Sequence, residues 1–413
     1  MQKVVIHFSV SNDRLTPSMI SEFEKNNPTI SIQRVDPKQY YMLNHEKSIE
    51  QLDIISISVE DFPYYVGQGL AMNLSPYMNK NPLFAEKLIS PDLSFLKFEN
   101  KAQGKGEYFG FLNGWFPGYI LLFNKSLFDA AGVDYLDSDQ PMTWNQLLEL
   151  AQKLTIKKDG QLEQYSFGIA GQKTMIDLPL YLFQMEQLGK TPWYDQHNKA
   201  DFTSDESKTI FEYWNKALQA NLGPNLMNQV TEMPEQLFLD NRLAILMVDY
   251  GFAMQMEQSK GELSNYGIAP TPVFENGKSI HPILTKSAAI IQAKTKYPNE
   301  AWKVFEWFFT GEHAQQWVMN GNELPVFKAD LDKLPQSTEW TKQVAEYYQS
   351  IIPYSRSVLD FNPHLPVGVV NNIFDKYLVP VYFGKSEFKM MLYSITQDVN
   401  FQIENSRQYE IKK

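Results

Sequence analysis

The chain has 413 residues, a formal charge of −11, 43% hydrophobic residues and no cysteine. This length exceeds what one hydrophobic core usually supports, and so predicts two domains. The net negative charge, together with the lack of clusters of Lys or Arg, argues against binding to nucleic acid or to an anionic membrane surface. The lack of cysteine excludes disulfides, thiolate metal sites and cysteine nucleophiles, and no apolar run approaches the roughly 20 residues that span a bilayer.

The N-terminal segment predicts the start of a doubly wound α/β domain. Lys3 to Val10 is a β-branched strand, Thr16-Pro17 begins a helix, and Ile30 to Val35 is a second strand. In such sheets, ligands bind beyond the carboxyl ends of the strands. The loop Ser11 to Arg14 is therefore expected at a binding edge, with Asn12 and Arg14 as candidate ligand residues.

A third strand is predicted over Leu52 to Ile57, and an acidic loop follows it. Glu60 and Asp61 lie in that loop. A solvated acidic turn would account for both of them, and a role in ligand binding is the other interpretation.

The central stretch from Phe111 to Leu154 is the most informative part of the chain. Asn113 to Gly118 is punctuated by Gly and Pro, as expected of a crossing between lobes, and within it Trp115 is a candidate platform for a sugar ring. A core tryptophan is the alternative. A buried strand over Tyr119 to Phe123 and a short helix ended by Gly132 follow. Thr143 and Gln146 then form a predicted capping box.

Further along, a strand over Tyr165 to Ala170 and a helix from Leu178 flank Asp177, which is a candidate site residue. Leu237 to Met254 contains a second apolar run, and Asp249 and Tyr250 at its end are further candidates.

The order of these segments resembles that found in the extracellular solute-binding proteins of carbohydrate ABC importers. The resemblance rests on Phe-Asn-Lys, Leu-Phe, Ala-Gly and Pro-Met-Thr-Trp within Phe123 to Trp144, on Gly69-Leu70 and Leu74 to Tyr77, on Gly267 to Pro272, and on Ala301-Trp302. It covers the chain from about Lys3 to Asn400. The sequence departs from the family pattern at Phe123, Met142 and Asn241, and where the family usually has Gly-Gly it has His281-Pro282.

The resemblance implies a two-lobed periplasmic-binding-protein fold, each lobe a sheet flanked by helices, joined by a hinge. Lobe one would be residues 1–113 plus 284–328, and lobe two 118–279 plus 329–413. A carbohydrate would bind in the cleft between lobes, close them upon itself, and pass to the membrane permease subunits of an ABC importer. The implied ligand residues are Asn12, Arg14, Glu60, Asp61, Trp115, Asp177, Asp249, Tyr250 and His281.

The resemblance further implies a monomer that acts outside the cytoplasm, lipid-anchored or periplasmic, with its signal segment not part of this sequence. A cytosolic protein without cysteine is the alternative. No cofactor and no metal are expected, because the six His are scattered and the acidic run Asp134, Asp137 and Asp139 lacks the spacing and glycine of a calcium loop. No phosphate-binding glycine loop or nucleophile elbow is present. The resemblance to a family of binding proteins implies that the protein is not an enzyme, and a glycosidase with paired carboxylates is the runner-up.

Overall fold

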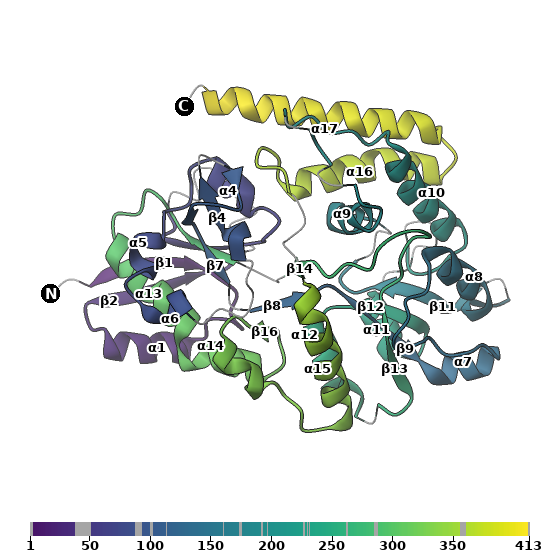
Figure 1. Ribbon diagram of the computed structural model, residues 1–413, viewed down its shortest axis with the longest axis horizontal. Helices are drawn as coiled ribbons and strands as arrows, with labels where there is room; N and C mark the ends of the chain where they lie inside the picture. The colour runs from purple at the N-terminus through teal and green to yellow at the C-terminus, as the bar shows by residue number, and fades with distance from the viewer. Residues whose placement is uncertain are drawn as a thin grey trace. The chain divides into compact units, whose positions relative to one another are not determined.

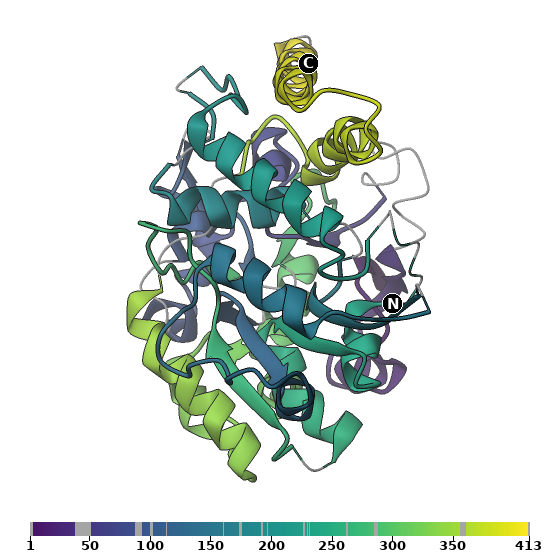
Figure 2. The same cartoon turned by 90° about the vertical axis from the view of Figure 1, so that its right-hand side faces the viewer.

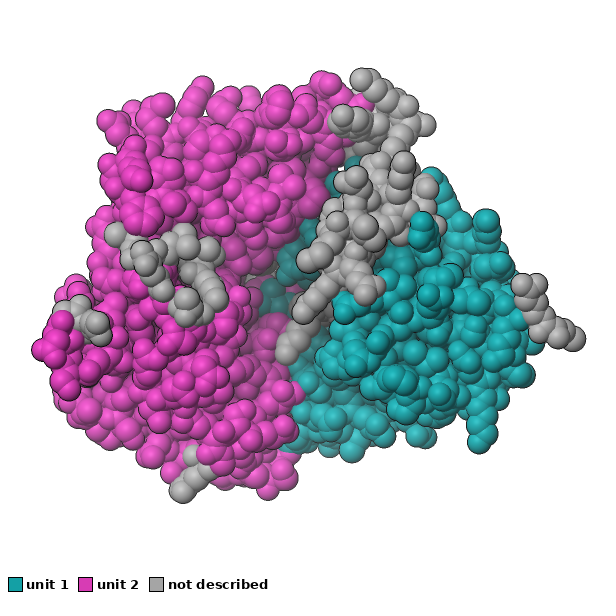
Figure 3. Space-filling view, turned by 180° about the vertical axis from the view of Figure 1, so that it is seen from behind, with its two compact units in different colours: residues 1–115, 284–335 teal, residues 116–283, 336–413 magenta. Residues whose placement is uncertain are grey.

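In the computed structural model, the chain divides into two compact units. The structure describes residues 3–37, 51–86, 93–99, 102–112, 114–159, 161–172, 176–190, 193–195, 197–225, 228, 230, 232–261, 263–284, 288–355 and 361–411. Unit 1 comprises residues 1–115 and 284–335, and unit 2 comprises residues 116–283 and 336–413 (Figures 1 and 3). No described helix combines the length and the apolar character needed to cross a membrane.

Unit 1 is built on a five-stranded sheet in the order β2-β1-β3-β15-β7. β1 lies parallel to both β2 and β3, whereas β15 runs antiparallel to β3 and β7. The parallel pairing brings the carboxyl ends of β1, β2 and β3 to one edge. The strands are β1 (Val4–Ser9), β2 (Ile30–Val35), β3 (Ile54–Ile57), β15 (Ala288–Ile291) and β7 (Phe111–Leu112).

Helices cover this sheet and share its core. α1 begins at Pro17 after Thr16, whose side chain accepts a hydrogen bond from Met19 N, so the predicted helix start is confirmed. α13 packs on β1 and β15, and Phe308 meets Phe8 edge-on at a centroid distance of 5.0 Å. The helices are α1 (Pro17–Asn26), α4 (Phe62–Gly67), α5 (Ser75–Met78), α6 (Pro82–Glu86), α13 (Pro298–Thr310) and α14 (Glu312–Met319), with the 3-10 turns η1 (Leu93–Leu96) and η2 (Lys328–Lys333). A small sheet of β4 (Lys97–Glu99), β5 (Ala102–Gln103) and β6 (Glu107–Tyr108) completes the unit.

Unit 2 is built on a second sheet in the order β10-β11-β12-β9-β13. All six residues of β12 are buried, which explains its continuous apolar sequence. β11 and β12 are parallel, and β9 runs antiparallel to both β12 and β13. The strands are β9 (Ile120–Asn124), β10 (Ile156–Lys158), β11 (Gln161–Ile169), β12 (Leu243–Val248) and β13 (Tyr266–Pro270).

Two helices of unit 2, α8 after Thr143 and α9 at Leu178, begin where the sequence predicts. The predicted capping box is confirmed: Gln146 N donates to Thr143 Oγ1 at 3.1 Å and Thr143 N donates to Gln146 Oε1 at 2.7 Å. Figure 2 shows α16 and α17 lying side by side. The helices are α7 (Lys125–Ala131), α8 (Trp144–Leu154), α9 (Leu178–Gln187), α10 (Asp205–Gln219), α11 (Pro234–Leu239), α12 (Tyr250–Lys260), α15 (Glu339–Ile351), α16 (Val367–Tyr382) and α17 (Phe388–Ile411), with the 3-10 turn η3 (Ile352–Tyr354).

The chain passes between the units after Trp115, Ile283 and Pro335. The first two passages lie in β8 (Gly114–Pro117) and β14 (Ile283–Leu284), which share a three-stranded sheet with β16 (Leu324–Pro325). Asn113, at the start of the predicted crossing, lies outside the described residues. The last passage comes later than the predicted position at 328/329, because η2 packs on α14 and β16 and so belongs to unit 1.

The departure from the family pattern at Asn241 has a local explanation. Asn241 has φ of 56°, a left-handed conformation in which Asn is the most tolerated residue after Gly. Its Oδ1 also accepts hydrogen bonds from Asn124 Nδ2 and Tyr266 Oη, both at 2.9 Å. The side chain therefore adds contacts that a glycine could not make.

Candidate functional site

The carboxyl edge of the unit 1 sheet carries four of the predicted site residues. β1 and β3 are parallel neighbours with Ser9 opposite Ile55, so the loops that follow them lie at the same edge. Asn12 and Arg14 are in the first loop, and Glu60 and Asp61 are in the second. Asn12 is exposed and its Oδ1 accepts from Arg34 Nη1, while Glu60 and Asp61 are half-buried in the turn that enters α4.

Arg14 is held by a buried carboxylate and an aromatic ring. Its Nη1 lies 3.4 Å from Glu323 Oε2, and its guanidinium carbon lies 3.9 Å from the ring centroid of Trp317. The Arg14 side chain is 10% exposed and that of Glu323 only 1%. Burial lowers the pKa of the Arg14 guanidinium from its ordinary value, and the neighbouring Glu323 carboxylate opposes that shift.

The prediction that Trp115 offers an exposed ring face is wrong. Its side chain is 1% exposed, and its indole N–H donates to the Pro325 carbonyl at 3.0 Å. Trp115 also pairs with Leu324 across β8 and β16. These partners fix it within the core of unit 1, where its ring cannot stack on a sugar.

The carboxyl edge of the unit 2 sheet carries the other acidic candidates. Ile169 in β11 is opposite Met247 in β12, so the segments beyond both strands lie at one edge. Asp177 and Asp249 both cap helices there: Asp177 accepts from Leu180 N at 2.9 Å, and Asp249 accepts from Phe252 N at 2.8 Å. The two carboxylates thus have a structural role that the sequence analysis did not assign to them.

Asp177 belongs to a polar cluster that joins α9 to α16. Its Oδ2 accepts from Gln172 Nε2 at 2.8 Å, and Asn371 Oδ1 in α16 accepts from Leu178 N at 2.8 Å. Burial raises the pKa of Asp177 to about 6, the helix-end hydrogen bonds oppose the rise, and the nearby Asp375 carboxylate adds to it. Burial also raises the pKa of Asp375. Ionisation of Asp177 therefore destabilises the folded protein.

This cost predicts a stabilising substitution, Asp177→Asn. Since the folded-state pKa of Asp177 lies above that of an ordinary aspartate, stability falls as pH rises from about 4 to about 6. An asparagine keeps an oxygen for the Leu180 cap, and a 180° turn of the Gln172 amide would bring its Oε1, which is buried without a partner, toward the new amide donor. Unfolding of the variant at pH 7.5 should require up to about 3 kcal/mol more than wild type, with no gain below pH 4.

Urea unfolding across pH 3.5–8 measures this difference. Asp249→Asn, which changes the other capping carboxylate of this edge, sets the baseline for an amide cap. A gain for Asp177→Asn that is the same at every pH would contradict the assignment.

Tyr250 is buried and cannot serve as an exposed stacking platform either. Its ring is 0% exposed and meets Tyr348 edge-on, with ring centroids 5.1 Å apart. The hydroxyls of both tyrosines are buried without a partner in the described structure. Tyr250 can therefore offer a ligand a hydrogen bond through its hydroxyl, but no ring face. The hydroxyl of Tyr348, in the middle of α15, can offer a second hydrogen bond.

His281 precedes β14 and is half-buried. Burial lowers the pKa of its imidazole from the ordinary value, which keeps the ring neutral at pH 7. It can therefore offer one donor and one acceptor, but no charge, to a ligand.

Buried oxygens without a hydrogen-bond partner lie at both carboxyl edges, one in unit 1 and four in unit 2. Each such group costs about 1–3 kcal/mol unless a ligand or water satisfies it. Among the described residues, those at or beside the two edges are Ser9 Oγ, Gln172 Oε1, Glu235 Oε2, Tyr250 Oη and Tyr348 Oη. Three of the five are hydroxyls, which can donate or accept, and Gln172 Oε1 and Glu235 Oε2 accept, so the set suits a ligand whose own hydroxyls can do both.

Within the described part of the chain, no group of three or more His, Cys, Asp or Glu could hold a metal ion. The acidic run at Asp134 to Asp139 forms a local turn instead, in which Asp137 Oδ1 accepts from Asp139 N at 2.8 Å and from Gln140 N at 2.9 Å.

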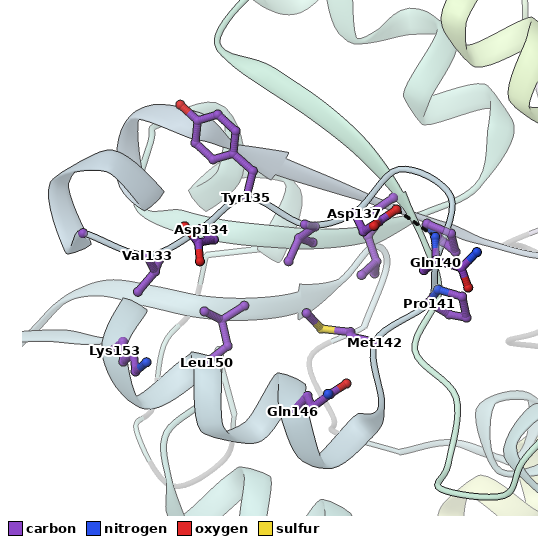
Figure 4. Close-up of a pocket in the computed structure, with 15 residues that line it drawn as sticks. Val133, Asp134, Tyr135, Asp137, Gln140, Pro141, Met142, Gln146, Leu150 and Lys153 are labelled. Carbon is purple, nitrogen blue, oxygen red and sulfur yellow. Dashed lines mark hydrogen bonds between the residues drawn. The ribbon is translucent and has the colours of Figure 1, made fainter.

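A cavity of about 500 Å³ lies elsewhere in unit 2, between the segment that joins α7 to α8 and one side of α8. Figure 4 shows Gln146, Leu150 and Lys153 of α8 along one side of it, with Asp134 and Met142 opposite. None of the predicted site residues lines this cavity.

Sequence reasoning missed Gln172, Glu235, Tyr348, Trp317 and Glu323. The strand-end rule could have found Gln172, because this residue lies just beyond the predicted strand Tyr165 to Ala170. The others lie on helices or near a short strand and carry no local signal.

Comparison with known proteins identifies the family to which this chain belongs. The model of the bacterial extracellular solute-binding protein family matches residues 11–315. The maltodextrin-binding protein MdxE of Bacillus subtilis is 27% identical over 142 residues, which are 34% of this chain and 32% of that protein.

Solved structures match over nearly the whole chain. The ABC substrate-binding protein Lmo0181 of Listeria monocytogenes, in complex with cycloalternan, has a TM-score of 0.75 at 18% identity, with 98% of this chain and 99% of that chain covered. The sugar-binding protein MalE of Xanthomonas citri has a TM-score of 0.71 at 15% identity, with both chains fully covered. The predicted two-lobed α/β fold is confirmed by these matches.

Proposed function

Because the chain belongs to the bacterial extracellular solute-binding proteins, we propose that it binds a carbohydrate outside the cytoplasm and delivers it to the permease of an ABC importer. The observation that carries the choice of ligand is the set of buried, unpartnered oxygens at the carboxyl edges of both sheets. A sugar presents several hydroxyl donors at once, and each can offset the desolvation of one such oxygen. The sugars in the names of similar proteins agree with this chemistry.

The ligand hydroxyls have charged and neutral partners in this proposal. Asn12, Arg14, Glu60 and Asp61 act from unit 1, and Asp177, Asp249 and His281 act from unit 2. Charge-assisted hydrogen bonds of this kind are about twice as strong as neutral ones. Trp115 and the ring of Tyr250 have no stacking role.

A ligand screen tests this function. We expect one of glucose, maltose, maltotriose or cycloalternan to raise the melting temperature, since ligand at a hundredfold excess over Kd stabilises by about 2.7 kcal/mol. Amino acids and short peptides serve as the contrasting class of solute. Stabilisation by peptides and by no sugar would overturn the carbohydrate assignment.

We further propose that the protein acts on its ligand only by binding, as a lipid-anchored monomer. Chromatography of the incubated sugar should recover it unchanged, and light scattering should give the monomer mass of 47.8 kDa. Turnover of a glycoside, abolished in Glu60→Ala or Asp61→Ala, would favour a glycosidase instead.

A further inference from the structure

Arg14, in the loop after β1, pairs with a side chain 309 positions away along the chain. Arg14 N and Leu15 N both donate to the Ser11 carbonyl at 3.2 Å, which forms a tight turn at the candidate binding edge. Beneath this turn lies Glu323, which is 0% exposed. Its Oε2 accepts from Arg14 Nη1 at 3.4 Å and from Trp317 Nε1 at 3.1 Å. The carboxylate thus fixes both the guanidinium and the ring on which it lies.

This arrangement leaves most of the Arg14 donors for another partner. A guanidinium has five N–H donors, and that of Arg14 donates one hydrogen bond, to Glu323, within the described structure. None of its nitrogens is among the buried atoms without a partner, so the remaining donors reach the surface. The Arg14 guanidinium stacks on Trp317 and pairs with Glu323, and these two contacts restrain its N–H donors to one orientation.

The position of Glu323 is itself tightly defined. Leu324 and Pro325 pair with Trp115 and Gly114 across β16 and β8. A Cβ at Gly114 would lie 2.5 Å from Glu323 Cβ and 2.8 Å from the Leu324 carbonyl oxygen, so only glycine permits this approach. Glu323 therefore directly precedes a strand whose distance from β8 is tightly restricted.

From these contacts we propose that Glu323 and Trp317 are positioning residues for ligand capture, which orient Arg14 so that its free donors meet the ligand. The inference rests on the proposed function, because it assigns a role in binding the same sugar. Neither residue need touch the ligand itself.

A double-mutant cycle at Arg14 and Glu323 tests this role, with the tightest-binding sugar of the screen as probe. Arg14→Gln and Glu323→Gln should each weaken binding by about tenfold or more, and the double variant should bind no more weakly than Arg14→Gln alone. Affinities are measured by calorimetry at a temperature where each variant is fully folded by circular dichroism. Trp317→Phe, which keeps a ring but removes the N–H donor, should fall between wild type and Glu323→Gln.

Asp330→Asn is the matched control. Asp330 is also a buried carboxylate of unit 1, 6% exposed, and it accepts from Lys333 Nζ at 2.6 Å. This variant should lose stability and keep the wild-type affinity. If Glu323→Gln behaves like Asp330→Asn, or if the losses at Arg14 and Glu323 multiply, the positioning role is overturned while the proposed function stands. A wild-type protein that binds no sugar would overturn the proposed function, and this role with it.

Discussion

Replacing Trp115 by alanine is expected to lower the free energy of unfolding by about 3–5 kcal/mol, the usual cost of truncating a core tryptophan. The physical reasons are the loss of a ring that is 1% exposed and the loss of its hydrogen bond to the Pro325 carbonyl. The alanine would also leave that carbonyl without its donor next to the β8–β16 pair. Urea unfolding followed by circular dichroism measures the loss.

Two further variants separate the loss of the buried ring from the loss of its hydrogen bond, and from the removal of an exposed ring. Trp115→Phe keeps most of the ring and removes only the donor, so it should cost less than the alanine variant. Tyr297→Ala removes an aromatic ring of the same unit that is 40% exposed, and should cost far less. A Trp115→Ala protein that keeps its stability but binds sugar tenfold more weakly would restore the stacking role that burial argues against.

Gly223→Ala should destabilise unit 2 by about 3 kcal/mol or more, at the upper end of overpacking effects. A Cβ at this position would lie 2.0 Å from the Phe167 carbonyl oxygen, and backbone cannot rotate away as a side chain could. The preceding residue already accepts hydrogen bonds from Ser166 N at 3.0 Å and Phe167 N at 2.9 Å. The methyl group would therefore push this segment away from β11. Urea unfolding measures the loss.

Gly368→Ala is the matched control for this substitution. Gly368 lies in α16 of the same unit, and a Cβ there would meet nothing within 4 Å. Helix propensity then predicts a small gain in stability, up to about 1 kcal/mol. Equal stability of the two alanine variants would show that the close approach to Phe167 is absent in solution.

Local sequence signals were sufficient for most elements and for the two candidate edges. The capping box at Thr143, the left-handed Gly132 at φ 65° after α7 and the strand Ile30–Val35 all depend on neighbouring residues, and all are confirmed. The strand-end rule placed Asn12 and Arg14 at the edge of the unit 1 sheet because it needs only the strands and their direction, whereas Glu60 and Asp61 were implied by the family resemblance.

The environment of a side chain depends on partners that local patterns do not contain. Trp115 between glycines suggests exposure, yet Leu324 and Pro325 bury it; Tyr250 follows a strand end, yet Tyr348 of α15 covers its ring. The same limit concealed Glu323, because nothing near residue 14 indicates which carboxylate pairs with it. Tertiary contacts between distant segments decided each of these cases.

The insertion of β15 between β3 and β7 determines the order in which the chain can be folded during synthesis. Without β15, β7 has no neighbour in the unit 1 sheet, although β1, β2, β3 and β7 are all made early. Every strand of the unit 2 sheet, from β9 to β13, leaves the ribosome before Ala288. Thus the sheet whose first strands are made earliest is the one completed last, while all strands of the unit 2 sheet are already available to pair.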